Sequence, residues 1–173
     1  MAEHWTLFYL LTAMVWLYRR ARAFRSLREI PRPEISSPPT PAPKVSILLP
    51  VKNEEVNLKD CLNALRAQDY PAKEIIVIND NSVDRTAEIL SKALRLYPNL
   101  LQGVNAPPVP EGWTGKNWAL HQGVPRAQGE WFLFTDADTR HEPGALASAL
   151  APAEARALAR LTLAPRCIVE GVW

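Results

Sequence analysis

The sequence is short of the residues that build several common kinds of functional site. Its 173 residues include two cysteines and three histidines, which lie far apart, so we expect neither a disulfide framework nor a zinc site. No Gly-x-Gly-x-x-Gly motif follows a predicted strand, which argues against a dinucleotide-dependent oxidoreductase, and GWTGKNWALHQG lacks the glycine spacing of a P-loop. A net charge of only +2 provides no strong field for nucleic acid, so we expect no nucleic-acid partner.

The longest apolar run lies near the N-terminus. Residues 5–18 (WTLFYLLTAMVWLY) are fourteen residues with two threonines as the polar members, and five arginines follow within residues 19–28. A membrane span needs about 20 apolar residues, with about 17 as the lower limit, so the run is borderline. A signal peptide carries its positive charges before the apolar run, not after it. The positive-inside rule therefore predicts a single-pass N-terminal anchor in the cell membrane, within residues 1–30, with the rest on the cytoplasmic face. The alternative is an ordinary buried or interfacial helix.

A proline-rich stretch separates this segment from the rest of the chain. Residues 31–43 (PRPEISSPPTPAP) contain six of the sixteen prolines. Such a sequence cannot form a helix or a central strand, and it tends toward extended polyproline II structure. We therefore predict a semi-rigid linker between the anchor and a body that spans residues 44–173.

Apolar runs and helically spaced apolar residues alternate along the body. Strands are predicted at 45–51, 74–79, 100–105, 130–135 and 158–163. Helices are predicted at 57–67, 83–97, 117–122 and 143–150. This alternation indicates an α/β fold with a mostly parallel sheet and helices on both faces. Ligands of such sheets bind beyond the carboxyl ends of the strands, which directs attention to the residues after each predicted strand.

Asp136 and Asp138 follow the fourth predicted strand. In an extended chain, residues two apart point to the same side, so these carboxylates repel each other unless a cation lies between them. A hard divalent ion with oxygen ligands suits that position and keeps sites open for phosphate oxygens. The pattern by itself is also common in surface turns.

Other polar residues occupy the remaining strand ends. Asp80 follows the second strand, where it can accept hydrogen bonds from a base or a ribose hydroxyl, or cap the next helix. Ser82 is expected to cap the helix at 83–97, and Asp84 suits either role. Lys116 lies beside a glycine, from which it can reach a diphosphate. Trp113 and Trp118 are expected either to stack on a base or sugar or to lie in the core.

Taken together, these pieces resemble glycosyltransferase family 2, which has the GT-A fold, a nucleotide-diphospho-sugar transferase fold of the Rossmann-like kind. The resemblance rests on VSILLPVKNEEVNLKDCLNALRAQDYP, EIIVINDNSVDRTAEIL and GKNWALHQGVPRAQGEWFLFTDADT, in the family's order over roughly residues 44–150. GWTGKNWA resembles the membrane-associated subgroup that acts on hopanoid- or carotenoid-type lipids. The sequence departs from the family's Asp-Asp-Gly-Ser after the second strand, because it has Asn79-Asp80-Asn81-Ser82.

The resemblance implies a nucleotide-sugar donor, most often a UDP-sugar, with Mg²⁺ or Mn²⁺, and a lipid or other membrane-associated acceptor. The residues that match the family's donor-binding positions are Glu54, Glu55, Asp80, Lys116 and Asp136. Asp136 and Asp138 match the metal-binding pair.

The family's acceptor half and its general base lie well beyond the Asp-x-Asp motif, whereas only 35 residues follow Asp138 here. Their acids, Glu142, Glu154 and Glu170, are in no recognisable base motif, so no catalytic residue is assigned. We therefore expect residues 44–173 to be a GT-A domain that is incomplete at its C-terminus, the donor-binding half of a glycosyltransferase. The alternative is a non-catalytic, membrane-tethered nucleotide-binding protein. A nucleotidyltransferase ranks last, because no loop rich in glycine and arginine follows the first strand.

Overall fold

A computed structural model describes residues 2–28 and 36–163 of the chain. The chain divides into two compact units, residues 1–34 and 35–173. The division falls inside the proline-rich stretch that is predicted to be a linker. Two residues considered in the sequence, the cysteine Cys167 and the acid Glu170, lie outside the described residues.

The first unit contains one helix, α1, Ala2–Arg28. It continues without a break through the arginine cluster, and its side chains from residue 8 to residue 22 are exposed. In the described part of the chain, no helix is both long enough and apolar enough to cross a membrane. The membrane anchor therefore stays a prediction.

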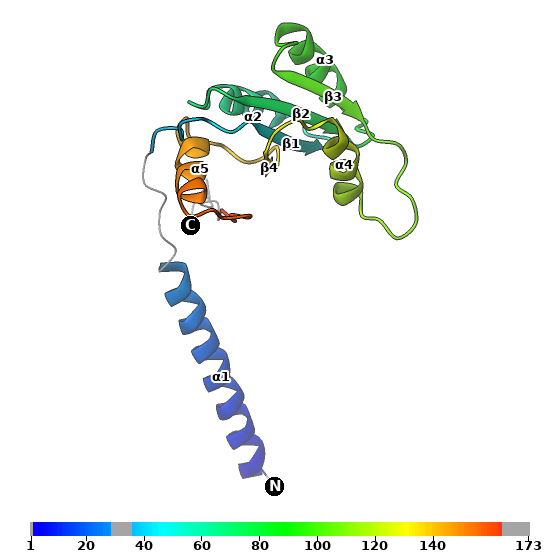
Figure 1. The fold of residues 1–173 in the computed structure, drawn as a ribbon. Coiled ribbons are helices and arrows are strands. Elements are labelled where there is room, and N and C mark those ends of the chain that lie inside the picture. Colours follow the sequence, from blue (N-terminus) through cyan, green and yellow to red (C-terminus); the bar gives the residue numbers. More distant parts are fainter. Residues whose placement is uncertain (1, 29–35, 164–173) are drawn as a thin grey trace. The chain divides into compact units, whose positions relative to one another are not determined.

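The second unit is built on a four-stranded parallel sheet, shown in Figure 1. Its strands lie in the order β3-β2-β1-β4, with the bounds β1 Val45–Val51, β2 Lys73–Asn79, β3 Leu101–Asn105 and β4 Trp131–Phe134. The helices are α2 Leu58–Arg66, α3 Thr86–Leu96, α4 Gly115–Gly123 and α5 Ala145–Ala155, and a 3₁₀ turn covers Val124–Arg126. All three strand pairings are parallel, which confirms the predicted α/β fold.

Helices cover both faces of the sheet, as the sequence predicts. On one face, alternate residues of the central strands, such as Ile47 and Ile75, pack with buried side chains of α2, α3 and α5. On the other face, Leu48, Ile76 and Ile78 pack against α4. Both central strands are buried almost throughout, which explains why their sequences are mostly apolar and do not alternate between apolar and polar residues.

Helix α4 lies unusually close to the sheet at its last residue, Gly123. A Cβ atom there would lie 2.8–2.9 Å from side-chain carbons of Ile78 and Leu48, both of which are fully buried. Only a residue without a side chain permits this approach. The contact fixes the distance between α4 and the two central strands, and α4 carries Lys116 at its other end.

Three sequence-based expectations about the elements are wrong. Helix α3 begins at Thr86, not at residue 83, and Val83 is 90% exposed, because residues 82–84 are used in loop contacts described below. Residues 158–163 form no strand and have no strand partner in the described part of the chain. The final helix begins at Ala145 and extends to Ala155, beyond the expected 143–150.

The described part of the proline-rich stretch, residues 36–43, packs against the body instead of forming part of the predicted semi-rigid linker. The backbone N–H of Ser36 donates to Ser148 Oγ on α5 at 3.3 Å, and the Tyr70 hydroxyl donates to the Pro43 carbonyl at 2.8 Å. Residues 36–43 contain no helix or strand, as predicted. Prolines lack an N–H group, so an extended segment rich in them leaves few donors to satisfy when it lies along a protein surface.

Candidate donor-binding site

The candidate site lies at the edge of the sheet where the parallel strands β1, β2 and β4 end. Two asparagines turn the chain just after β1 and β2: Asn53 and Asn81 have left-handed backbone conformations, with φ of 56° and 52°. Such conformations are tolerated better by asparagine than by most other residues. They turn the chain away from the sheet directly after Lys52 and Asp80 and leave those two side chains at its edge.

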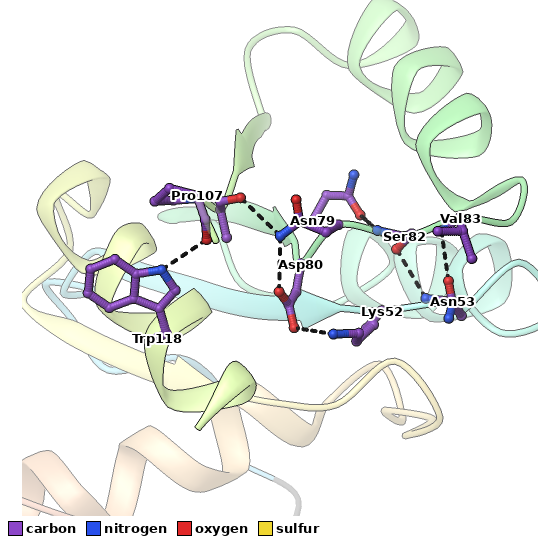
Figure 2. Close-up of polar contacts among 10 residues, drawn as sticks. Lys52, Asn53, Asn79, Asp80, Ser82, Val83, Pro107 and Trp118 are labelled. Atoms are coloured by element: carbon purple, nitrogen blue, oxygen red, sulfur yellow. Dashed lines mark hydrogen bonds and ion pairs between the residues drawn. The ribbon is translucent and has the colours of Figure 1, made fainter. Parts of the chain in front are cut away.

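The loops after β1 and β2 are tied together by hydrogen bonds, drawn in Figure 2. The backbone N–H of Asn53 donates to Ser82 Oγ at 3.0 Å, and Asn53 Oδ1 accepts from the Val83 N–H at 2.9 Å. Ser82 N–H in turn donates to Asn79 Oδ1 at 3.2 Å. Ser82 therefore bonds the neighbouring loop and does not cap α3, which corrects the sequence-based expectation. Asp84 takes a capping role, because its Oδ1 accepts from the Thr86 N–H at 2.9 Å in the first turn of α3.

Asp80 is the most buried of the predicted site residues, at 4% exposure. Its Oδ2 lies 3.2 Å from Lys52 Nζ, and the two side chains point toward each other in Figure 2. Its Oδ1 accepts a 3.4 Å hydrogen bond from the side chain of Asn81. A Cβ atom at Gly115 would lie 2.9 Å from Asp80 Oδ2, so the absent side chain at 115 lets the start of α4 touch this carboxylate.

Asp136 and Asp138 lie in the turn that follows β4. The residue between them, Ala137, is 2% exposed and belongs to the core, whereas both aspartates are exposed. The backbone turns here, since the Thr139 N–H donates to the Asp136 carbonyl at 3.2 Å. The predicted extended conformation is therefore wrong. Burial of Ala137 nevertheless keeps both carboxylates outside the core.

Lys116 joins the two acidic positions. It follows Gly115, the residue of α4 that contacts Asp80. The Lys116 Nζ lies 2.6 Å from Asp136 Oδ1. The structure thus brings together three of the predicted residues, Asp80, Lys116 and Asp136, from two strand ends and one helix start. Each acid holds a lysine: Lys52 on Asp80 and Lys116 on Asp136.

Glu54 and Glu55, predicted to lie close to the nucleotide, make contacts with helix starts. Glu54 Oε2 accepts from the Asn57 side chain at 3.0 Å, just before α2. Glu55 Oε2 accepts from the Arg85 N–H at 3.1 Å, just before α3. The Glu55 carboxylate thus satisfies a backbone N–H beside the positive end of the α3 dipole, whereas the Glu54 carboxylate binds the side chain of the residue before α2. Their donor-binding role stays a prediction, and their observed role is to fix the loops beside the site.

Cys61 on α2 packs beneath the Asp136–Asp138 turn. Its Sγ lies 3.7 Å from the Asp136 carbonyl oxygen, and its side chain is fully buried. Burial raises the pKa of the Cys61 thiol to about 11, Arg140 acts in the opposite direction, and Asp138, Glu54 and Asp136 raise the pKa further. The thiol is therefore neutral near pH 7 and serves packing.

His141 lies just after the turn. Its Nε2 is 2.8 Å from Thr135 Oγ1, and burial lowers its pKa below the ordinary value. A neutral imidazole at this position holds Thr135, the residue that connects β4 to Asp136.

Trp113, Trp118 and His121 form an aromatic cluster on α4 and the loop before it. The Trp113 and Trp118 ring centroids are 5.2 Å apart, and Trp118 and His121 stack at 5.5 Å. The Trp118 Nε1–H donates to the Pro107 carbonyl at 3.0 Å, which fixes that ring (Figure 2). Trp113 is 43% exposed, which excludes the core alternative for this ring, and stacking on a base or sugar stays a prediction.

The exposed Asp136–Asp138 pair fits a particular kind of metal site. Among the described residues, no group of three or more histidine, cysteine, aspartate or glutamate side chains is arranged to hold a metal ion. Two exposed carboxylates cannot fill the coordination sphere of Mg²⁺ or Mn²⁺, but such ions accept water and phosphate oxygens as further ligands. The pair therefore fits a hard cation that is shared with a bound diphosphate, rather than a closed structural site.

Sequence reasoning missed Lys52 as a member of the site. The register of the sheet explains why Lys52 belongs there. Val51 pairs with Asn79, so the residues that follow them, Lys52 and Asp80, are neighbours at the edge of the sheet. The closeness of Gly115 to Asp80 has no comparable signal in the sequence, because it depends on how α4 packs on the sheet.

Comparison with known proteins is consistent with this geometry. Beta-monoglucosyldiacylglycerol synthase of Synechocystis sp. is 30% identical over 138 residues, which cover 72% of this chain and 28% of the synthase. The structure of mannosyltransferase PcManGT from Pyrobaculum calidifontis, solved with GDP-Man and Mn²⁺, matches 78% of this chain and 38% of its own, with a TM-score of 0.59 and 28% identity. S. aureus TarS 1–349, solved with UDP-GlcNAc, matches 65% of this chain and 31% of its own, with a TM-score of 0.53 and 30% identity.

The chain spans about a third or less of the length of the curated relatives that it matches. The profile of the family described as "Glycosyl transferase family 2" matches residues 46–166, which is more than half of the chain and contains every predicted site residue. Together with the parallel sheet and the acids at its carboxyl edge, this match shows that the chain belongs to glycosyltransferase family 2.

Proposed function

We propose that residues 36–163 bind a nucleotide-sugar donor, with UDP as its nucleotide and Mg²⁺ or Mn²⁺ as its metal. The proposed reaction is transfer of the sugar from this donor to a lipid or other membrane-associated acceptor. The observation that carries the proposal is the meeting of Asp80, Lys116 and Asp136 at the carboxyl edge of the sheet. The solved relatives hold UDP-GlcNAc in one case and GDP-Man with Mn²⁺ in the other, which supports the donor class and the metal.

Each residue has a chemical part in this proposal. Asp80, buried and already accepting two hydrogen bonds, has remaining lone pairs for a base N–H or a ribose hydroxyl. Asp136 and Asp138 would hold the divalent cation, which offsets the negative charge that develops on a departing diphosphate. Lys116, in the first turn of α4, supplies a cation and sits beside helix N–H groups that favour phosphate.

The sequence assigns no general base, and Glu154 is not placed beside the candidate site. Glu154 accepts a hydrogen bond from Trp131 Nε1 at 2.5 Å. Trp131 is the first residue of β4, so Glu154 lies at the opposite end of that strand from Asp136. A general base contributes about 10²–10⁴-fold to a rate. We therefore propose donor binding by this chain and assign no residue to proton transfer.

We also propose that residues 1–30 attach the chain to the cell membrane, with the body on the cytoplasmic side. The exposed apolar side chains of α1 between Phe8 and Tyr18, followed by the arginines, support this attachment. One relative is named as the synthase of a glycosylated diacylglycerol, beta-monoglucosyldiacylglycerol, and this name is consistent with a lipid acceptor. Deletion of residues 1–30 should move the protein from the membrane fraction to the supernatant. A full-length chain that is already soluble without detergent would contradict the attachment.

Calorimetric titration of the full chain with UDP tests the donor site. We expect binding in Mg²⁺ or Mn²⁺ that is lost in EDTA, and loss of metal-dependent binding in Asp136→Ala and Asp138→Ala, because each removes a ligand of the cation. Asp60→Ala is the matched control. Asp60 is an exposed acid that pairs with Arg140, close to the same turn, so its removal changes the local charge without removing a predicted ligand. Equal UDP affinity in metal and in EDTA would remove the metal from the proposal, and no UDP binding in either condition would refute the donor site.

A further inference from the structure

The Lys116–Asp136 contact occupies the carboxylate that the predicted cation needs. Lys116 Nζ is 2.6 Å from Asp136 Oδ1, which is the distance of a close, charge-assisted hydrogen bond. An ammonium group at that distance and a divalent cation bound to the same carboxylate would repel each other at short range. The contact seen in the free chain and the metal-bound site are therefore competing arrangements of one carboxylate.

We propose that Lys116 is an exchangeable place-holder for the metal. In the free protein its ammonium holds Asp136, and when a divalent cation takes Asp136, the ammonium moves to the diphosphate of the nucleotide. This inference rests on the proposed function, because it requires that a nucleotide diphosphate bind at this edge of the sheet.

The position of Lys116 suits such an exchange. Its backbone follows Gly115, which contacts Asp80, whereas the tip of its side chain reaches Asp136, so the stem spans the space between the two acids. The Lys116 side chain is 58% exposed and the Asp136 side chain is 50% exposed. A lysine has a long flexible stem, and an ion pair this exposed is weak and exchanges readily. A nucleotide whose nucleoside lies at Asp80 would carry its diphosphate toward Asp136, within reach of the same ammonium.

The exchange makes the metal and the nucleotide bind cooperatively. A cation that arrives alone must break the Lys116–Asp136 pair and leave the ammonium without a partner. A diphosphate that arrives alone meets two exposed carboxylates, Asp136 and Asp138, while Lys116 is engaged. When both arrive, the cation binds the Asp136 carboxylate and the diphosphate binds the Lys116 ammonium that the cation displaces. The coupling is reciprocal, and couplings between bound ligands are typically about 5- to 150-fold in affinity.

The test compares Lys116→Met, Lys116→Arg and the control Lys92→Met in the full chain. Methionine keeps much of the apolar stem and removes the charge. Lys92 also forms an exposed ion pair, with Glu88 at 2.6 Å on α3, so its replacement reproduces the loss of one surface lysine away from the site. Mn²⁺ binding without nucleotide is followed by the electron paramagnetic resonance signal of free Mn²⁺, and UDP binding with and without Mn²⁺ by calorimetry.

We expect Lys116→Met to bind Mn²⁺ alone about five- to tenfold more tightly than the unaltered chain, because the competing cation is gone. It should bind UDP in Mn²⁺ more weakly, so the coupling between the two ligands falls. Lys116→Arg should restore the low affinity for Mn²⁺, and Lys92→Met should match the unaltered chain. Unchanged or weaker Mn²⁺ binding by Lys116→Met, including no detectable binding, would overturn the place-holder. Failure of the unaltered chain to bind UDP would instead refute the donor site, and the Mn²⁺ measurement would still decide whether Lys116 competes with the cation.

Discussion

Replacement of Gly123 by alanine tests whether the packing of α4 on the sheet supports the site. The added methyl carbon would lie 2.8–2.9 Å from Ile78 Cδ1, Ile78 Cγ1 and Leu48 Cδ2. Both neighbours are fully buried on central strands, so neither side chain has solvent-exposed space into which to move. Overpacking of this kind costs about 1–3 kcal/mol. Alanine regains up to about 1 kcal/mol of helix propensity, less at the last residue of a helix. We therefore expect a net loss of about 1–2 kcal/mol in the free energy of unfolding.

Gly144→Ala is the matched control, because no heavy atom lies within 4 Å of a Cβ built at that glycine. Its effect should stay within about 0.5 kcal/mol, as for a surface substitution. Urea unfolding followed by tryptophan fluorescence compares the two variants with the unaltered chain. Gly123→Ala should also bind UDP more weakly, since α4 can relieve the clash only by moving away from the sheet and carrying Lys116 with it. A Gly123→Ala midpoint equal to that of Gly144→Ala would refute the close packing of α4.

Three further substitutions test other parts of the structure. Asp80→Ala should weaken UDP binding by about 0.5–3 kcal/mol in calorimetry while Mn²⁺ binding persists, because Asp80 is a hydrogen-bond acceptor and not a predicted metal ligand; unchanged UDP affinity would remove Asp80 from the site. The pKa of the Glu74 carboxyl is subject to burial, which raises it, but hydrogen bonds from Ser46, the Gln128 N–H and Lys44 lower it below its ordinary 4.5 overall. That stabilisation is present above the unfolded-state pKa and is lost as the pH falls through the folded-state pKa. The urea concentration at the unfolding midpoint should therefore decrease when the pH is lowered below about 5 in the unaltered chain, and it should decrease less in Glu74→Gln. Equal pH dependence in the two proteins would contradict the stabilising role of the ionised Glu74 carboxylate. In a Cys167→Ser background, Cys61 should resist a thiol reagent at pH 8 until urea unfolds the chain, because burial raises its pKa to about 11; prompt labelling of the folded protein would show that the Asp136 turn does not cover it.

The central sheet could be predicted from the sequence because two strands are buried on both faces. Residues 45–51 are apolar except for Ser46, residues 75–78 are an unbroken apolar run, and the structure has strands at 45–51 and 74–79 within one residue. The position of the acids beyond the strands followed from the parallel arrangement, which places all carboxyl ends at one edge. The same reasoning located Asp80 and Asp136 at one site although they are far apart in the sequence.

The start of α3 could not be predicted, because it depends on contacts between two loops. Val83 fits the helical spacing of the following apolar residues, but its N–H is used by Asn53 Oδ1, from the loop after β1. Ser82 and Asp84 likewise bond residues 53 and 55, about thirty positions earlier in the chain. The spacing of apolar residues within a segment cannot indicate hydrogen bonds to residues that far away in the sequence. The strand predicted at 158–163 failed for a related reason, since a strand needs a neighbouring strand, and none lies beside it among the described residues.

The lysines of the site show why a pattern of acids alone describes it incompletely. Asp80, Asp136 and Asp138 together carry one more charge than Lys52 and Lys116, so the free site is only slightly negative. A diphosphate without a cation would make the site strongly negative, and a divalent ion bound with it restores a balance close to that of the free site. In the proposed exchange Lys116, which neutralises Asp136 before binding, is then available to the phosphate oxygens. Under the proposed function, charge balance would favour the binding of metal and nucleotide together, and this expectation follows from the two ion pairs rather than from the Asp-x-Asp motif.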